Sequence, residues 1–217
     1  LLLEKMRHVG VTGREEAARL MHCRRPALRK ARQNIYYAGR EMTDHLAYLW
    51  GLSFGDYLRM NPVYMSSLQI HDLVRKGHEV GAHGTDHPWF SILTRERALT
   101  QIRESMDDIS RRFRVSHRYF AFPFTDHGVS DGTIQRLFDE KIIEAGFGTA
   151  GLKEDRWKHY YQRIPMELGH HTARQVIHGE LVRRTLRKYA GRNLVDRKYE
   201  PGLAERYQEK GAHLRPR

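Results

Sequence analysis

Residues 77–90 read GHEVGAHGTDHPWF, and this stretch decides the fold expected for the whole chain. It opens on a glycine that can end a helix, continues as a short strand over 78–83, and then turns. His83 and His87 follow the strand, four residues apart, with small or polar residues between them. One helical turn there would direct both imidazoles into the same space, and neutral imidazoles suit Zn²⁺ and other divalent metals. The alternative is two partly exposed histidines that cap a loop, since 14 histidines in 217 residues give about one such pair by chance.

Helix patterns flank this stretch on both sides. Ser66 can cap a helix that ends at Gly77, with Gln69 completing a capping box. Thr94 can cap a longer helix, in which apolar residues recur at intervals of three and four residues and so form one buried stripe. The residues of that stripe are Leu99, Ile102, Met106, Ile109 and Phe113.

Strand and helix patterns then alternate toward the C-terminus. Strands are expected over 119–124, 145–151 and 162–167, and helices over 132–142 and 172–191. This alternation predicts an α/β fold with a largely parallel sheet, in which ligands gather at the carboxyl ends of the strands. Polar residues occur at those ends, where Thr125 and Asp126 follow one expected strand and Glu167 ends the last.

The sequence divides into three expected parts. Residues 1–58 have helical patterns, including EEAARLMH at 15–22 and PALRKARQNIYYAGR at 26–40. Residues 59–192 form the expected α/β domain, and 193–217 form a basic, polar tail.

Charge and composition limit the classes of function. The net charge of +12 lies at the two ends, because residues 1–40 and 172–217 carry +7 each while the middle carries −2. Such flanks can attract nucleic acid or another anionic polymer, but they lack the interleaved aromatics of a stacking platform.

Cys23 is the single cysteine, which excludes an internal disulfide, and the sequence has no apolar run of about 18 residues that would predict a membrane span. No signal-peptide pattern occurs, and neither a cytoplasmic nor an exported location, nor an oligomeric state, is indicated.

The stretch at 77–90 closely resembles the second motif of polysaccharide deacetylases with the NodB-homology domain, carbohydrate esterase family 4. In that family a helix ends in a Gly-His/Phe-Glu-Val/Ile-Gly segment, and an H-[S/T]-x-x-H element follows and binds zinc or a similar ion. The resemblance runs from about Asn61 to Ile177. It includes YFAFPFTDHG at 119–128, similar to the third motif, a Pro-aromatic turn that forms one wall of the active-site groove.

The resemblance implies a fold, a substrate and a set of site residues. The fold would be an incomplete (β/α) barrel with an N-terminal helical insertion, of which residues 1–58 would be the remnant. His83 and His87 would bind a divalent metal, most often Zn²⁺, with Co²⁺ or a similar ion as an alternative. The substrate would be an acetylated carbohydrate, and its contacts would be Pro123, Phe124 and Thr125.

One part of the family's pattern has no counterpart in these residues. In the family, a strand ending in Thr-Phe-Asp-Asp-Gly supplies the catalytic base and the third metal ligand, and here we expect that strand upstream of residue 1. Asp126 could replace a lost carboxylate, or it could be a turn residue beside Gly128. Leu168-Gly169-His170 fits by its letters the Leu-x-His motif that protonates the leaving amine, but His170 could equally be a loop residue before the last helix.

Three functions of different classes follow. The first is metal-dependent hydrolysis of acetyl groups on a carbohydrate, impaired because the Asp pair is missing. The second is a non-catalytic glycan-binding or scaffold domain with the same fold. The third, ranked last, is a nucleic-acid or anionic-polymer binder that uses the basic flanks.

Overall fold

The computed structural model describes residues 44, 47–48, 51–166 and 171–197. The chain divides into two compact units, one made of Leu1–Ser66 with Arg206–Arg217 and the other of Ser67–Glu205. In the first unit, α5 (Phe54–Met60) is capped by Ser53, whose hydroxyl accepts a hydrogen bond from the Asp56 amide. The helices expected over 15–22 and 26–40 lie outside the described residues.

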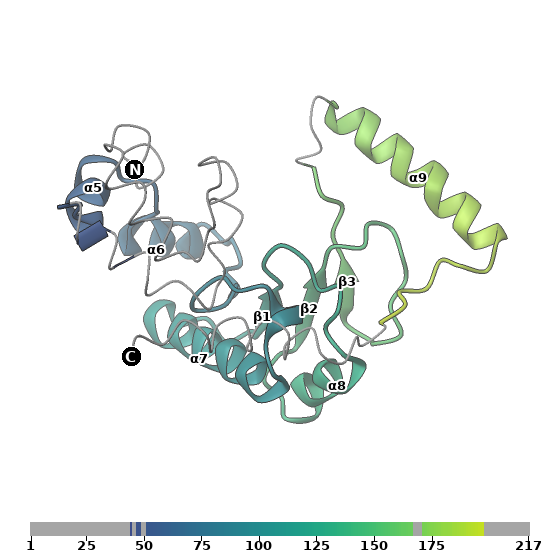
Figure 1. Cartoon of the computed structure of the whole chain (residues 1–217), viewed down its shortest axis with the longest axis horizontal. Coiled ribbons are helices and arrows are strands. Elements are labelled where there is room, and N and C mark those ends of the chain that lie inside the picture. The colour runs from purple at the N-terminus through teal and green to yellow at the C-terminus, as the bar shows by residue number, and fades with distance from the viewer. Residues whose placement is uncertain (1–43, 45–46, 49–50, 167–170, 198–217) are drawn as a thin grey trace, which may run out of the picture. The chain divides into compact units, whose positions relative to one another are not determined.

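The second unit is built on a small parallel sheet (Figure 1). Its strands are β1 (Tyr119–Ala121), β2 (Ala145–Gly148) and β3 (Tyr160–Gln162), in the order β1-β2-β3. A single parallel bridge joins Ala82 to Phe120 beside β1. All these segments run in one direction, so their carboxyl ends meet at one edge, and the expected α/β class with a parallel sheet is confirmed.

The helices of this unit are α6 (Ser67–Arg75), α7 (Arg95–Phe113), α8 (Asp131–Asp139) and α9 (Ala173–Tyr189), with a 3-10 turn η3 (Phe90–Ile92). Side-chain caps begin α7, α8 and α9. Thr94 caps α7, as the sequence predicts, by accepting from the Arg97 amide. Thr172 caps α9 in a reciprocal capping box with Gln175. These caps satisfy amides that have no partner within the helix.

The core lies where α7 and α8 pack on one face of the sheet (Figure 1). Phe120 from β1 is fully buried there and contacts the rings of Phe90 and Phe122. The predicted stripe of α7 faces this core, with Leu99, Ile102 and Met106 all buried. Burial of this apolar surface is what holds the helices to the sheet and so fixes the strand ends that carry the site.

The expected strands are wrong in their extent: β1 and β2 each end three residues earlier than the expected 119–124 and 145–151, and the other two differ more. Residues 78–83 are not a strand beyond the bridge at Ala82, because the ring of His117 binds the Val80 carbonyl that a neighbouring strand would need. The last strand is β3 at 160–162 rather than 162–167. Pro165, which has no amide hydrogen, cannot continue the ladder.

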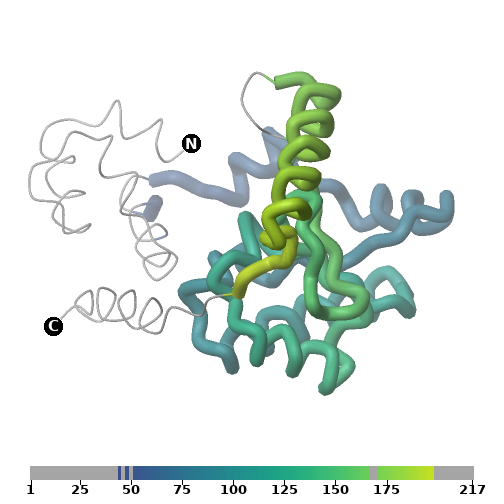
Figure 2. Tube along the Cα trace, turned by 90° about the vertical axis from the view of Figure 1, so that its right-hand side faces the viewer, coloured from purple at the N-terminus to yellow at the C-terminus, as the bar shows by residue number. Residues whose placement is uncertain are grey.

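After α9 the chain runs back toward the strands (Figure 1), and Figure 2 shows α9 and the segment that follows it from another side. Glu154 forms a parallel bridge with Leu194, and its amide donates to the Asn193 carbonyl at 2.9 Å. Residues 193–197, the first part of the stretch expected to be a polar tail, therefore pack against the loop that precedes β3. No helix among the described residues is long and apolar enough to cross a membrane.

Phe120→Ala is expected to lower the free energy of unfolding by about 3–5 kcal/mol, because it removes a fully buried ring and leaves a cavity in the core. Urea unfolding measures the loss. Leu186→Ala in α9 is the control, since Leu186 is 64 % exposed and its truncation should change the free energy of unfolding little. Equal effects of the two substitutions would contradict this assignment of the core.

Candidate functional site

The fold brings His83 and His87 together at the carboxyl edge of the sheet. Both follow the bridge at Ala82, and their ring centroids lie 4.9 Å apart with an interplanar angle of 66°. Gly84 adopts φ 91° between them, a backbone conformation that favours glycine. The segment between the two histidines is a bend rather than the expected helical turn, but it brings both rings into one region.

His83 is held by one ring nitrogen and leaves the other available. Its Nδ1 lies 2.6 Å from the Ala121 carbonyl, which can only accept, so Nδ1 carries the hydrogen and Nε2 has the lone pair. Desolvation of the packed side of the ring lowers the pKa of His83 more than this hydrogen bond raises it, and the charges of His87 and Arg163 lower the pKa further. The neutral imidazole that results is the form that binds a metal.

An aromatic surface lies directly beside the histidine pair. The ring of Phe124 contacts the ring of His87 at 4.5 Å between centroids and that of Trp89 at 5.7 Å. Phe124 is 56 % exposed and Trp89 is 51 % exposed, while Pro123 is buried behind them. Of the three predicted substrate contacts, Phe124 thus offers an open ring next to the pair and Pro123 does not face solvent.

Thr125 and Asp126 line a separate, open cavity of about 230 Å³ at the same edge of the sheet. Thr125 accepts a hydrogen bond from the Thr149 hydroxyl at 3.1 Å. Lys153 and His127 also line the cavity, as does the segment after α9 through Val195, Asp196 and Arg197. The cavity therefore joins the loops that follow β1 and β2 to the returning C-terminal segment.

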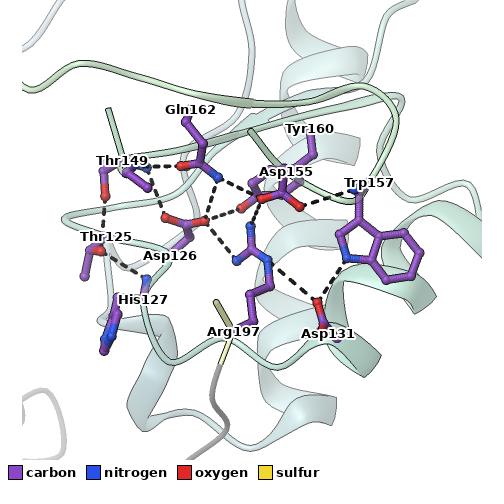
Figure 3. Close-up of polar contacts among 12 residues, drawn as sticks. Thr125, Asp126, His127, Asp131, Thr149, Asp155, Trp157, Tyr160, Gln162 and Arg197 are labelled. Atoms are coloured by element: carbon purple, nitrogen blue, oxygen red, sulfur yellow. Dashed lines mark hydrogen bonds and ion pairs between the residues drawn. The ribbon is translucent and has the colours of Figure 1, made fainter. Parts of the chain in front are cut away.

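Asp126 is buried beneath this cavity and bound on all sides (Figure 3). Its carboxylate pairs with Arg197 at 2.9 Å and accepts from the Thr149 amide at 3.0 Å and the Tyr160 hydroxyl at 3.1 Å. Burial would raise the pKa of Asp126, but Arg197 and the hydrogen bonds from Thr149 and Gln162 hold it below its ordinary value. Asp126 is therefore an ionised carboxylate whose oxygens are already bound by other residues.

Arg197 completes this buried cluster and was not found from the sequence. Its side chain is 2 % exposed and also pairs with Asp155, whose side chain is 1 % exposed, at 2.5 Å. Gly148 lies so close that a Cβ there would overlap the Asp126 carboxylate. Two acids and one arginine are thus buried together, with the glycine making room for them.

Arg163 is a second residue that the sequence did not single out. It follows β3, and its guanidinium donates to the Phe122 carbonyl at 2.7 Å and to the Gly148 carbonyl at 3.1 Å. It bridges the ends of β1 and β2 and adds positive charge near His83. Arg163 lies within the strand expected over 162–167, and this position was the one indication in the sequence that it lies near the site.

A divalent metal fits this pair as a partial site. His83 offers Nε2 with its other nitrogen bound to a carbonyl, which is the usual arrangement of a metal-binding histidine. No group of three or more His, Cys, Asp or Glu side chains that could hold a metal occurs among the described residues. His170, the predicted acid, lies outside the described residues.

Arg197→Met should lower the free energy of unfolding by about 3–5 kcal/mol at pH 7, because it leaves the buried Asp126 and Asp155 carboxylates without a counter-charge. Since the folded pKa of Asp126 lies below its unfolded value, this stabilisation is present above that value and is lost as the pH falls below about 4. The difference between wild type and variant should therefore shrink between pH 7 and pH 3.5 in urea unfolding.

Arg136→Met is the matched control for that experiment. Arg136 pairs with Glu96 and Glu140 at the surface, so its removal should change the free energy of unfolding little at either pH. A loss that is equally small for Arg197→Met would contradict the buried cluster.

Comparison with known proteins identifies one family. The sequence model of the family described as Polysaccharide deacetylase matches residues 31–143, just over half of the chain. The match includes both histidines and the turn at 123–125, and it begins upstream of Asn61, where the resemblance in the sequence becomes clear. No curated protein and no solved structure matches the chain. The matched segment carries the histidine pair and its aromatic wall, and the chain belongs to the polysaccharide deacetylase family.

Proposed function

We propose that this chain is a metal-dependent deacetylase domain that removes acetyl groups from a carbohydrate, with His83 and His87 as two of the metal's ligands. Family membership supports a deacetylase-like function on an acetylated carbohydrate. The metal part rests on one observation. The Nδ1 atom of His83 is bound to the Ala121 carbonyl at 2.6 Å, and the His87 ring lies 4.9 Å from the His83 ring.

Zn²⁺ is the metal we favour, with Co²⁺ or a similar ion as the alternative, because two imidazoles suit these ions. Such an ion polarises a carbonyl oxygen and lowers the pKa of bound water. His83 and His87 supply two protein ligands, one fewer than the usual catalytic set. No Thr-Phe-Asp-Asp-Gly segment occurs in the 217 residues. We therefore propose weak metal binding and low activity for this chain on its own.

The carbohydrate is proposed to stack on Phe124 and Trp89. Both rings are about half exposed, they contact each other, and Phe124 touches His87. A sugar ring held there would lie next to the histidine pair. Pro123, buried behind Phe124, would fix the turn, and the Thr125 hydroxyl is a further proposed substrate contact.

The two proposed catalytic residues receive different roles. Asp126 accepts hydrogen bonds from Thr149, Tyr160 and Gln162 and pairs with Arg197, so we propose that it positions the loops around the site. A role as base would require this cluster to open. His170 remains the proposed acid for the leaving amine.

The finer architecture is also a proposal. We infer that β1–β3 are part of a larger, incomplete (β/α) barrel, because parallel strands are normally covered by helices and continued by further strands. Residues 1–58 would be the remnant of a helical insertion. Residues 59–192 would be the deacetylase-like domain, and 193–217 a basic segment.

A non-catalytic glycan-binding domain is the second candidate. The exposed Trp89–Phe124 pair favours it, because ring stacking on a sugar needs no metal. The third candidate is a protein that binds nucleic acid or another anionic polymer through the basic flanks. Its affinity would fall steeply as the salt concentration rises.

Zn²⁺ or Co²⁺ should raise the thermal midpoint of the full chain, and His83→Ala should abolish that rise. Metal at 100 times its Kd would add about 2.7 kcal/mol to the free energy of unfolding. Differential scanning fluorimetry with and without metal measures the shift. His178→Ala, an exposed histidine on α9, is the control and should retain the shift. If wild type and His83→Ala responded alike, the proposed metal site would be wrong.

Phe124→Ala and Trp89→Ala should each weaken binding of an N-acetylglucosamine oligosaccharide by about 0.5–1.5 kcal/mol, because each removes one stacking ring. Calorimetry measures binding, and acetate release from the same oligosaccharide measures hydrolysis. Tyr189→Ala is the control, since Tyr189 is 90 % exposed on α9. Acetate release that stops on chelation supports the deacetylase. Binding that survives both chelation and His87→Ala, with no acetate released, supports the glycan-binding domain instead.

A further inference from the structure

Gln101 lies on α7 beneath the loop that joins the two histidines, and its side chain is almost wholly buried at 1 % exposure. Its Oε1 accepts from the Thr85 amide at 3.1 Å, from the Thr85 hydroxyl at 2.5 Å and from the Asp86 amide at 3.3 Å. Its Nε2 donates to the Asp86 carboxylate at 3.0 Å. One side chain from the core thus binds two of the three residues between the histidines.

These contacts fix the orientation of the Gln101 amide. Two backbone N–H groups can only donate, so the oxygen must face them, and the NH₂ group must then face the Asp86 carboxylate. The arrangement depends on one amide oxygen and one amide nitrogen in fixed positions. No hydrocarbon side chain of similar size reproduces it, and a carboxylate reproduces half of it.

The loop needs such support because its backbone is strained at the second histidine. His87 has φ 52°, in the left-handed region that residues with a Cβ seldom adopt. Backbone of this kind persists where the surroundings determine it. Gln101 binds the two residues immediately before His87, while the buried Pro88 follows it.

A neighbouring buried polar residue of α7 forms its hydrogen bond only within the helix. Ser105 lies one turn further along α7 and is also buried, but its hydroxyl donates within the helix to the Ile102 carbonyl. Gln101 instead reaches out of the helix to a loop 15 and 16 residues earlier in the chain.

We infer that Gln101 is a positioning residue, which holds the loop so that the His83 and His87 rings converge on one ion. This inference rests on the proposed function, because it concerns the same pair of histidines. Partners of this kind behind metal ligands typically contribute about 10- to 100-fold to metal affinity.

The test compares the full chain with three variants that change the amide in different ways. Gln101→Leu removes both functions of the amide. Gln101→Glu keeps the acceptor but sets a second carboxylate against Asp86. The double variant Gln101→Glu/Asp86→Asn exchanges donor and acceptor and so restores both. Ser105→Ala is the control for the loss of a buried polar group on α7.

Two measurements separate positioning from folding. Isothermal titration with Zn²⁺ should give an affinity about 10- to 100-fold weaker for both single variants, with recovery in the double variant and no change for Ser105→Ala. Amide hydrogen exchange followed by NMR, without metal, should show lost protection at Thr85 and Asp86 in the single variants and its return in the double variant. If Gln101→Leu does not fold, Gln101→Glu and the double variant carry the test.

The outcomes distinguish the two proposals. Unchanged Zn²⁺ affinity in the folded single variants, or single and double variants that behave alike, would overturn the positioning role. If the wild type binds no Zn²⁺, the proposed metal site fails. The exchange data then decide the role of Gln101 alone, and unaltered protection at Thr85 and Asp86 would overturn it.

Discussion

Asp126 carries a buried negative charge at the carboxyl edge of the sheet, and much of the surrounding structure is arranged to neutralise it. Arg197 supplies the opposite charge from beyond α9, Thr149 donates from the end of β2, and Tyr160 donates from β3. A buried carboxylate without these partners would be strongly unfavourable. The Asp126 carboxylate therefore connects the segment after α9, the end of β2 and β3 through direct polar contacts.

This constraint places the candidate site beside a rigid cluster. The turn at 123–125 carries the exposed Phe124 ring, and Asp126 anchors its far end. On the other side of the site, the His83 ring is fixed by the end of β1 and the following loop is fixed by Gln101 from α7. The histidine loop and the turn that carries Phe124 thus each have polar contacts behind them. That is the arrangement needed where side chains must be held within a fraction of an ångström.

Local signals in the sequence predicted the elements that local interactions make. Thr94 and the apolar stripe of α7 lie within one stretch of sequence, so that helix was predictable, and the helix expected over 172–191 is observed as α9. The extent of the strand before His83 was not, because it depends on His117 binding the Val80 carbonyl, 37 residues away. The sequence did not predict the buried position of Arg197 either. It stands in a basic stretch, and its partner Asp155 lies 42 residues earlier in the chain.

The buried cluster also limits the ways in which Asp126 could act as a base at the proposed site. A catalytic base needs a carboxylate with a free oxygen and a pKa near the working pH, whereas a structural carboxylate needs filled partners and a low pKa. Asp126 satisfies the second set of conditions, through Arg197 and its hydrogen-bond donors, and it would satisfy the first only if this cluster opened. The stability of this edge of the sheet therefore depends on Asp126 with its partners in place. The contacts that hold the histidine loop, from Ala121 and Gln101, do not involve Asp126, so the position of the loop does not depend on whether Asp126 acts as a base.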